Sequence, residues 1–163
     1  MKTLYLIRHA KSDWSEENTA DLDRGLSKRG SKDLKAMGSY LLEKKIKPDL
    51  ILSSPALRAK LTAKKISKKI KYDKDIKYID KLYMPDLETI LDILSDQKDK
   101  NKSIFVVNHN PALTELANIL ADEYIDNIPT LGIVAIKLDI KKWKDIKDHK
   151  GKMDMFVYPK LLK

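Results

Sequence analysis

Two of the three histidines in this chain stand where their side chains could do chemistry together. His9 and His109 each follow a short apolar run, and Arg8 precedes His9 directly. Arg58 comes soon after a third apolar run. Imidazole is a nucleophile and a proton carrier near neutral pH, and the planar fork of guanidinium suits the oxygens of a phosphoryl group. These residue types predict phosphoryl-transfer chemistry.

The segments around Arg58 and His109 share a local design. Ser54–Pro55 and Asn110–Pro111 each place a capping residue before a proline, so each predicts a helix whose first residue is the proline. Helix N-termini attract anions, and Arg58 would lie in the first turn of its helix. Several cations around one point are costly without an anion, and a phosphoryl group would satisfy them.

The elements that must position these residues alternate along the chain. Runs typical of strands occur at Thr3–Ile7, Leu50–Leu52, Ile76–Ile79, Ile104–Val107, Gly132–Ile140 and Met153–Val157. Helices are expected from Ser27 to about Lys45, from Pro55, over Leu87–Leu94 and over Pro111–Leu120. Within the first helix, the residues expected toward the core are Leu34, Met37, Leu41 and Leu42. The polar segment Ser12–Arg24 has no period and is expected to be a loop.

This alternation predicts a single α/β domain over residues 1–163. We expect a three-layer sandwich around a mainly parallel sheet, with helices on both faces and an antiparallel C-terminal hairpin. In open α/β sheets, ligands bind outside the carboxyl ends of the strands. His9, Arg58 and His109 should therefore converge there.

Composition narrows the function classes. The chain has 163 residues, a net charge of +9 and no cysteine. No apolar run is long enough for a signal peptide core or a membrane span, so we expect a cytoplasmic protein without a membrane partner. The excess lysines are interrupted by acidic residues and lack an aromatic row for stacking bases, so we expect no nucleic-acid partner.

Other phosphate and hydrolase motifs are absent. The sequence has no glycine-rich phosphate loop with lysine, no Gly-x-Ser-x-Gly elbow and no His-Glu-x-x-His helix. Four segments instead resemble the histidine phosphatase superfamily, also called phosphoglycerate mutase-like, and especially its short SixA-type phosphohistidine phosphatases. These segments are Leu6–Trp14, Asp23–Gly30, Ser53–Ala63 and Val107–Pro111.

The resemblance implies a role for each matching residue. His9 would be the nucleophile, with its tautomer fixed by a backbone carbonyl, and Arg8, Arg58 and His109 would complete the phosphate pocket. Water would then hydrolyse phospho-His9, with no metal and no cofactor. Ser12 and Ser15 are further candidates for phosphate or substrate contact.

The sequence departs from the family pattern at three positions. Ala10 replaces the signature glycine, and Ser15 stands where many mutase-like members have asparagine. Met84 occupies the place where many relatives carry a glutamate acid. The possible acids near Met84 are Asp80, Asp86 and Glu88, and none matches the motif.

The missing glutamate bears on the substrate. An alkoxide leaving group needs a proton as it departs, whereas the imidazole of phosphohistidine can already be protonated near neutral pH. We therefore expect a shallow site that accepts protein phosphohistidine. Two alternatives stay open: a phosphatase of small phosphorylated molecules that uses Asp80, Asp86 or Glu88 as acid, and a phosphate-binding module without turnover.

Overall fold

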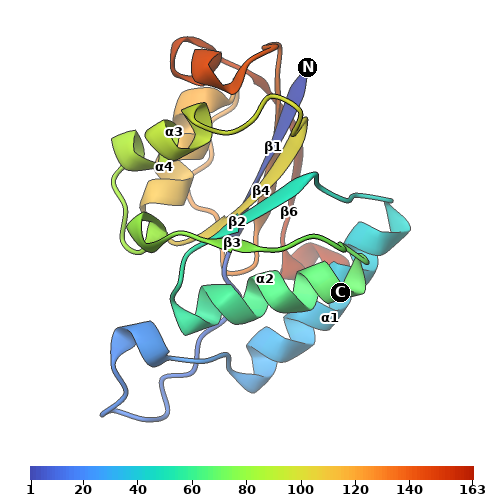
Figure 1. Cartoon of the computed structure of the whole chain (residues 1–163). Coiled ribbons are helices and arrows are strands. Elements are labelled where there is room, and N and C mark those ends of the chain that lie inside the picture. The colour runs from blue at the N-terminus through green and yellow to red at the C-terminus, as the bar shows by residue number, and fades with distance from the viewer.

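The computed structural model describes residues 1–163 and is built on one six-stranded sheet (Figure 1). The strand order is β3-β2-β4-β1-β5-β6. The strands are β1 (Lys2–Arg8), β2 (Leu50–Ser53), β3 (Lys77–Tyr78), β4 (Ser103–Asn108), β5 (Ile133–Leu138) and β6 (Lys152–Val157). The pairs from β3 to β1 are parallel, and β5 runs antiparallel to both β1 and β6. The predicted α/β fold with a mainly parallel sheet is confirmed.

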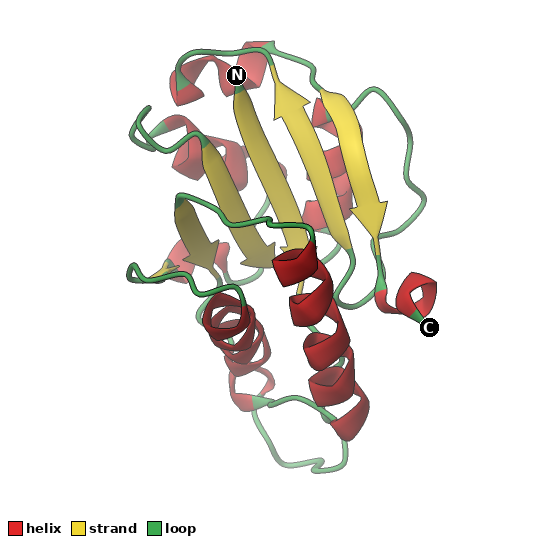
Figure 2. Ribbon diagram, turned by 90° about the vertical axis from the view of Figure 1, so that its right-hand side faces the viewer, coloured by secondary structure: helices red, strands yellow, loops and turns green.

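Helices cover both faces of this sheet (Figure 2). The helices are α1 (Lys28–Glu43), α2 (Leu57–Lys69), α3 (Leu87–Ser95) and α4 (Ala112–Leu120). The chain also contains four short 3-10 helices: η1 (Asp21–Asp23), η2 (Asp80–Leu82), η3 (Trp143–Asp148) and η4 (Pro159–Leu162). Helices α1 and α2 lie on one face, while α3 and α4 lie on the other (Figure 1). None of the helices is long and apolar enough to cross a membrane.

The apolar residues of β4 show why the sheet is buried on both sides. Ile104 and Val106 pack into the core beneath α3 and α4, whereas Phe105 and Val107 pack beneath α1 and α2. Successive side chains of a strand point to opposite faces, so a strand covered on both faces is apolar throughout. The unbroken run of apolar residues in β4 is therefore explained by the helices that cover both of its faces.

Helix α1 begins as its sequence predicts. The Ser27 hydroxyl accepts a hydrogen bond from the backbone N–H of Gly30 at 3.0 Å. A Cβ at Gly30 would lie 2.3 Å from the backbone oxygen of Lys11, so only glycine lets this helix end approach the chain just after His9. Leu42 was expected toward the core but is 40% exposed, because its neighbour Leu41 takes the core-facing position.

The predicted starts of α2 and α4 need correction. Helix α2 begins at Leu57, with Ala56 as its N-cap and no side-chain cap. Ser54 lies before the first turn of the helix, where its hydroxyl accepts a hydrogen bond from Ala56 N at 3.3 Å. Helix α4 begins at Ala112, one residue after Pro111, although the side-chain oxygen of Asn110 still accepts a hydrogen bond from Thr114 N at 3.2 Å.

The chain after α4 forms the expected antiparallel pair β5 and β6. Their connection is longer than a tight turn and contains η3, whose Trp143 and Ile146 are buried in the core beneath α3 and α4. The C-terminal strands extend the sheet beyond β1, and β6 is its edge strand.

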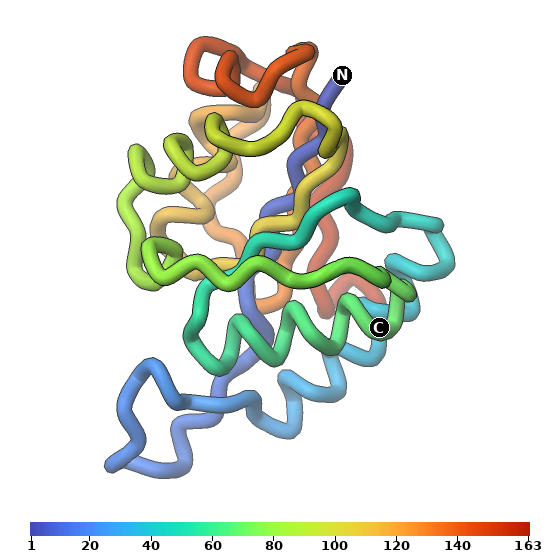
Figure 3. Tube along the Cα trace, viewed as in Figure 1, coloured from blue at the N-terminus to red at the C-terminus, as the bar shows by residue number.

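The carboxyl ends of the parallel strands meet at one edge of the sheet. The segment between β1 and α1 leaves the body of the molecule from this edge and returns to it (Figure 3). This segment was expected to be an irregular loop, but it contains η1 and a bridge between Ser12 and Leu26. The candidate site lies between these strand ends and this segment.

Candidate phosphate site

The structure brings the four predicted residues into one cavity of about 320 Å³. Arg8 ends β1 and His9 follows it, His109 follows β4, and Arg58 lies in the first turn of α2. The His9 and His109 rings lie 5.2 Å apart between centroids. Because β1 and β4 are adjacent and parallel in register, with Arg8 opposite Asn108, the two histidines emerge side by side.

His9 is held with one ring nitrogen available for attack. Its Nδ1 lies 2.8 Å from the backbone oxygen of Ala10. A carbonyl oxygen can only accept a hydrogen bond, so Nδ1 carries the proton and the neutral ring keeps its lone pair on Nε2. Burial is the main cause that lowers the pKa of His9 to about 4. The hydrogen bond to Ala10 raises this pKa, whereas the positive charges of Arg58 and Arg8 lower it further. His9 is therefore neutral at physiological pH.

Alanine fits at the position after His9. Ala10 is fully buried, and its backbone N–H donates to the Thr62 hydroxyl at 3.0 Å. The same hydroxyl donates to the backbone oxygen of Arg58 at 2.8 Å. One threonine on α2 thus links the chain after His9 to the first turn that carries Arg58.

His109 is fixed from the opposite ring nitrogen. Its Nε2 lies 2.6 Å from the Ser54 hydroxyl, which also accepts from Ala56 N at 3.3 Å. The Ser54 hydroxyl donates to no other group of the protein, so we infer that it donates to Nε2 and that the proton of a neutral His109 is on Nδ1. Burial, followed by the charges of His9 and Arg58, lowers the pKa of His109 to about 3. Ser54, expected as a helix cap, instead orients the second histidine.

Two buried nitrogen atoms of the site have no partner in the protein. They are Nδ1 of His109 and Nε of Arg8. Arg8 donates through Nη1 to the backbone oxygen of Ile128 at 3.0 Å, and burial lowers the pKa of its guanidinium. Buried donors without partners are rare because each costs a lost hydrogen bond. An anion bound between these residues would satisfy them.

Asp21 is the site residue that sequence reasoning missed. Arg58 directs both terminal nitrogens at it: Nη1 donates to its backbone oxygen at 2.8 Å and Nη2 to its Oδ2 at 3.1 Å. The Tyr83 hydroxyl donates to the same Oδ2 at 2.7 Å. Asp21 lies in a polar segment without periodicity, so no local pattern distinguished it from its acidic neighbours.

The position of the family acid also lies at the cavity. Met84 lines it and is 68% exposed, with a positive φ of 52°. The carboxylates near Met84 in sequence do not line it. Asp80 is exposed, Asp86 caps α3 by accepting from Thr89 N at 2.8 Å, and Glu88 pairs with Lys147 at 3.0 Å. The hydrogen bonds from Thr89 also lower the pKa of Asp86, which keeps that group ionised.

The two candidate serines are placed differently. Ser12 is buried and lines the cavity, where it is anchored by its bridge to Leu26. Ser15 is exposed, does not line the cavity, and its backbone N–H donates to Asp13 Oδ1 at 2.9 Å. The structure thus brings Ser12, but not Ser15, to the candidate site.

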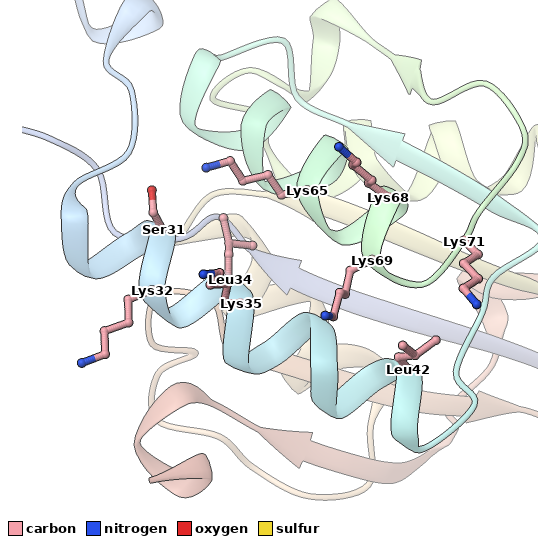
Figure 4. Close-up of a pocket in the computed structure, with 9 residues that line it drawn as sticks. All are labelled: Ser31, Lys32, Leu34, Lys35, Leu42, Lys65, Lys68, Lys69 and Lys71. Atoms are coloured by element: carbon pink, nitrogen blue, oxygen red, sulfur yellow. The ribbon is translucent and has the colours of Figure 1, made fainter.

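A larger cavity of about 830 Å³ lies between α1 and α2 (Figure 4). It is lined by Ser31, by Leu34 and Leu42, and by six lysines. It contains no histidine, no arginine and no carboxylate, and so offers neither a nucleophile matched to neutral pH nor a planar phosphate clamp. The smaller cavity at the strand ends holds both residue types and is therefore the candidate site.

Comparisons with known proteins agree with this geometry. The family described as "Histidine phosphatase superfamily (branch 1)" matches residues 4–83. A protein of Mycobacterium tuberculosis (strain ATCC 25618 / H37Rv) is 27% identical over 150 residues, which cover 86% of this chain and 91% of the relative.

Two solved structures share the whole fold. The putative phosphohistidine phosphatase SixA from Agrobacterium tumefaciens is 26% identical and superimposes with a TM-score of 0.82, covering 97% of this chain and 98% of its own. The protein histidine phosphatase SixA complexed with tungstate has a TM-score of 0.85 at 21% identity, and 99% of each chain is covered.

Proposed function

We propose that this chain, which belongs to the histidine phosphatase superfamily and is a phosphatase, removes the phosphoryl group from phosphohistidine on proteins. In this proposal the reaction passes through phospho-His9 and uses no metal. The observation that carries it is the His9 ring, which is neutral, buried and held by Ala10 so that Nε2 presents its lone pair.

The proposed first step is an in-line transfer. His9 Nε2 forms a bond to phosphorus while the bond from phosphorus to the leaving nitrogen breaks. The N–H donors of Arg8, Arg58 and His109 would hold the three equatorial oxygens as charge develops. Two of these donors are already buried without partners, so binding the phosphoryl group would satisfy them.

The second step returns the enzyme to its starting state. Water attacks the phosphorus of phospho-His9, and the electrons of the broken bond return to Nε2. The Nδ1 proton stays on the ring, where it is held by the oxygen of Ala10. His9 is therefore restored as the neutral tautomer in which it began. No group of three or more histidine, cysteine, aspartate or glutamate side chains that could hold a metal ion gathers in the structure.

The missing acid supports imidazole as the proposed leaving group. Asp21 is the one carboxylate that lines the cavity, and its hydrogen bonds from Tyr83 and Arg58 lower its pKa, so it is ionised at neutral pH. Met84 cannot donate a proton. A site without a protonated carboxyl group favours an imidazole over a basic alkoxide as the leaving group.

The substrate itself supplies the test. A protein carrying labelled phosphate on histidine is incubated with the wild type and with His9→Ala. Release of free phosphate and loss of the label from the substrate protein are both measured. We expect turnover by the wild type and none by His9→Ala. Aryl phosphate hydrolysis without any release from phosphohistidine would refute the substrate, and turnover by His9→Ala at a tenth of the wild-type rate would refute the nucleophile.

A further inference from the structure

Asp21 combines a fixed position with an unused oxygen. Both side-chain hydrogen bonds that it accepts, from Arg58 and from Tyr83, end on Oδ2. Its backbone oxygen is occupied by Arg58 as well. Oδ1 accepts no hydrogen bond from the protein, and the side chain is 42% exposed. The carboxylate is therefore oriented from one side and free on the other.

The charge of Asp21 distinguishes it from the other charged groups of the cavity. Arg8, Lys11 and Arg58 are cationic, and Asp21 is the one anion among the lining residues. A cavity that only had to bind phosphate would gain from excluding a carboxylate, because like charges repel. Holding the pair with Arg58 needs only the Oδ2 contact and leaves Oδ1 free to accept from another group. A second, cationic part of the substrate would be such a group.

The chemistry of phosphohistidine provides such a part. Its phosphoryl group is attached to one ring nitrogen, and a proton on the other makes the ring an imidazolium. When the nitrogen–phosphorus bond breaks, its electron pair stays on the leaving nitrogen. The ring then departs as neutral imidazole and keeps its proton. The positive charge passes to His9, whose Nδ1–H is held by the oxygen of Ala10.

We propose that Asp21 determines specificity for imidazole leaving groups by accepting, through Oδ1, a hydrogen bond from the ring N–H of the substrate. This inference rests on the proposed function. Asp21 would do for the substrate ring what the oxygen of Ala10 does for His9. An imidazole ring such as that of histidine, with a pKa of ~6.5, is mostly unprotonated at pH 8, and a carboxylate beside the substrate ring stabilises its protonated form in the transition state.

Asp21→Asn removes the charge while an amide oxygen can still accept from Arg58 and Tyr83. The matched control is Asp23→Asn, which removes an exposed carboxylate from the same short helix and does not line the cavity. Values of kcat/KM are measured for phosphohistidine and for nitrophenyl phosphate at pH 6 and pH 8. Nitrophenyl phosphate has no ring N–H and reports on the phosphate pocket alone.

For Asp21→Asn we expect phosphohistidine turnover to fall about tenfold more than nitrophenyl phosphate turnover at pH 8, and this difference between the substrates to be smaller at pH 6. Asp23→Asn should leave both substrates within about twofold of the wild type. Equal losses on both substrates at both pH values would overturn the inference, because Asp21 would then serve only to position Arg58. Unchanged turnover of both substrates would overturn it too. If the wild type hydrolyses nitrophenyl phosphate but not phosphohistidine, the proposed function itself fails.

Discussion

The two buried histidines should make the protein sensitive to mild acid. The pKa of His9 is lowered to about 4 and that of His109 to about 3, mainly by burial. In the unfolded chain both rings titrate near ~6.5. Between that value and pH 5 the unfolded state binds protons that the folded state refuses, so stability falls as the pH falls.

The size of this effect follows from the linkage between proton binding and folding. Each histidine contributes a slope of about 1.4 kcal/mol per pH unit once its unfolded form is protonated. From pH 7.5 to pH 5 this amounts to about 2 kcal/mol for each ring and about 4 kcal/mol for both. Most carboxylates stay ionised in both states above pH 5, so they add little in this window.

Urea unfolding at pH 7.5 and pH 5, followed by circular dichroism, measures the difference. We expect His9→Asn or His109→Asn to reduce the pH-dependent loss by about half, since each removes one proton-binding site of the unfolded state. His149 lies outside the cavity and is partly exposed, so His149→Asn is the matched control. A wild-type loss below about 1 kcal/mol, or equal losses in all three variants, would refute the reasoning.

Three further predictions concern activity. Arg58→Lys keeps the charge, but lysine cannot make paired planar contacts with the phosphoryl group. The loss of transition-state stabilisation, measured from kcat/KM, should be about 2 kcal/mol or more. Near-normal kcat/KM would place Arg58 outside the reaction. Because His9 must be neutral and has a pKa of about 4, kcat/KM for nitrophenyl phosphate, corrected for ionisation of that substrate, should decline only as the pH falls toward 4. A decline centred near ~6.5 would show that the ring is not desolvated in solution. Chelators should leave activity unchanged while vanadate, which can mimic the five-coordinate transition state, inhibits it, and activity lost to chelator but restored by magnesium would contradict the mechanism.

Local sequence determined much of this protein. The continuous apolar residues of β4 are typical of a strand buried on both faces. The capping of α1 by Ser27 could be predicted from the residue types. The convergence of Arg8, His9, Arg58 and His109 followed because the ends of parallel strands meet at one edge of a sheet. Periodicity and strand ends are properties of short segments, so they can be recognised from the local sequence.

The tertiary structure alone decided which polar groups face one another. Ser54 was expected as a helix cap, yet its hydroxyl holds His109, which is 55 residues away in the chain. Asp21 meets Arg58 and Tyr83 across 37 and 62 residues, and no periodic pattern in its own segment marks it. Hydrogen bonds between distant loops depend on how the layers pack, because a single sequence records the donors and acceptors but not their pairing. The side chains that tune the phosphate site therefore became visible only once the sheet had brought its loops together.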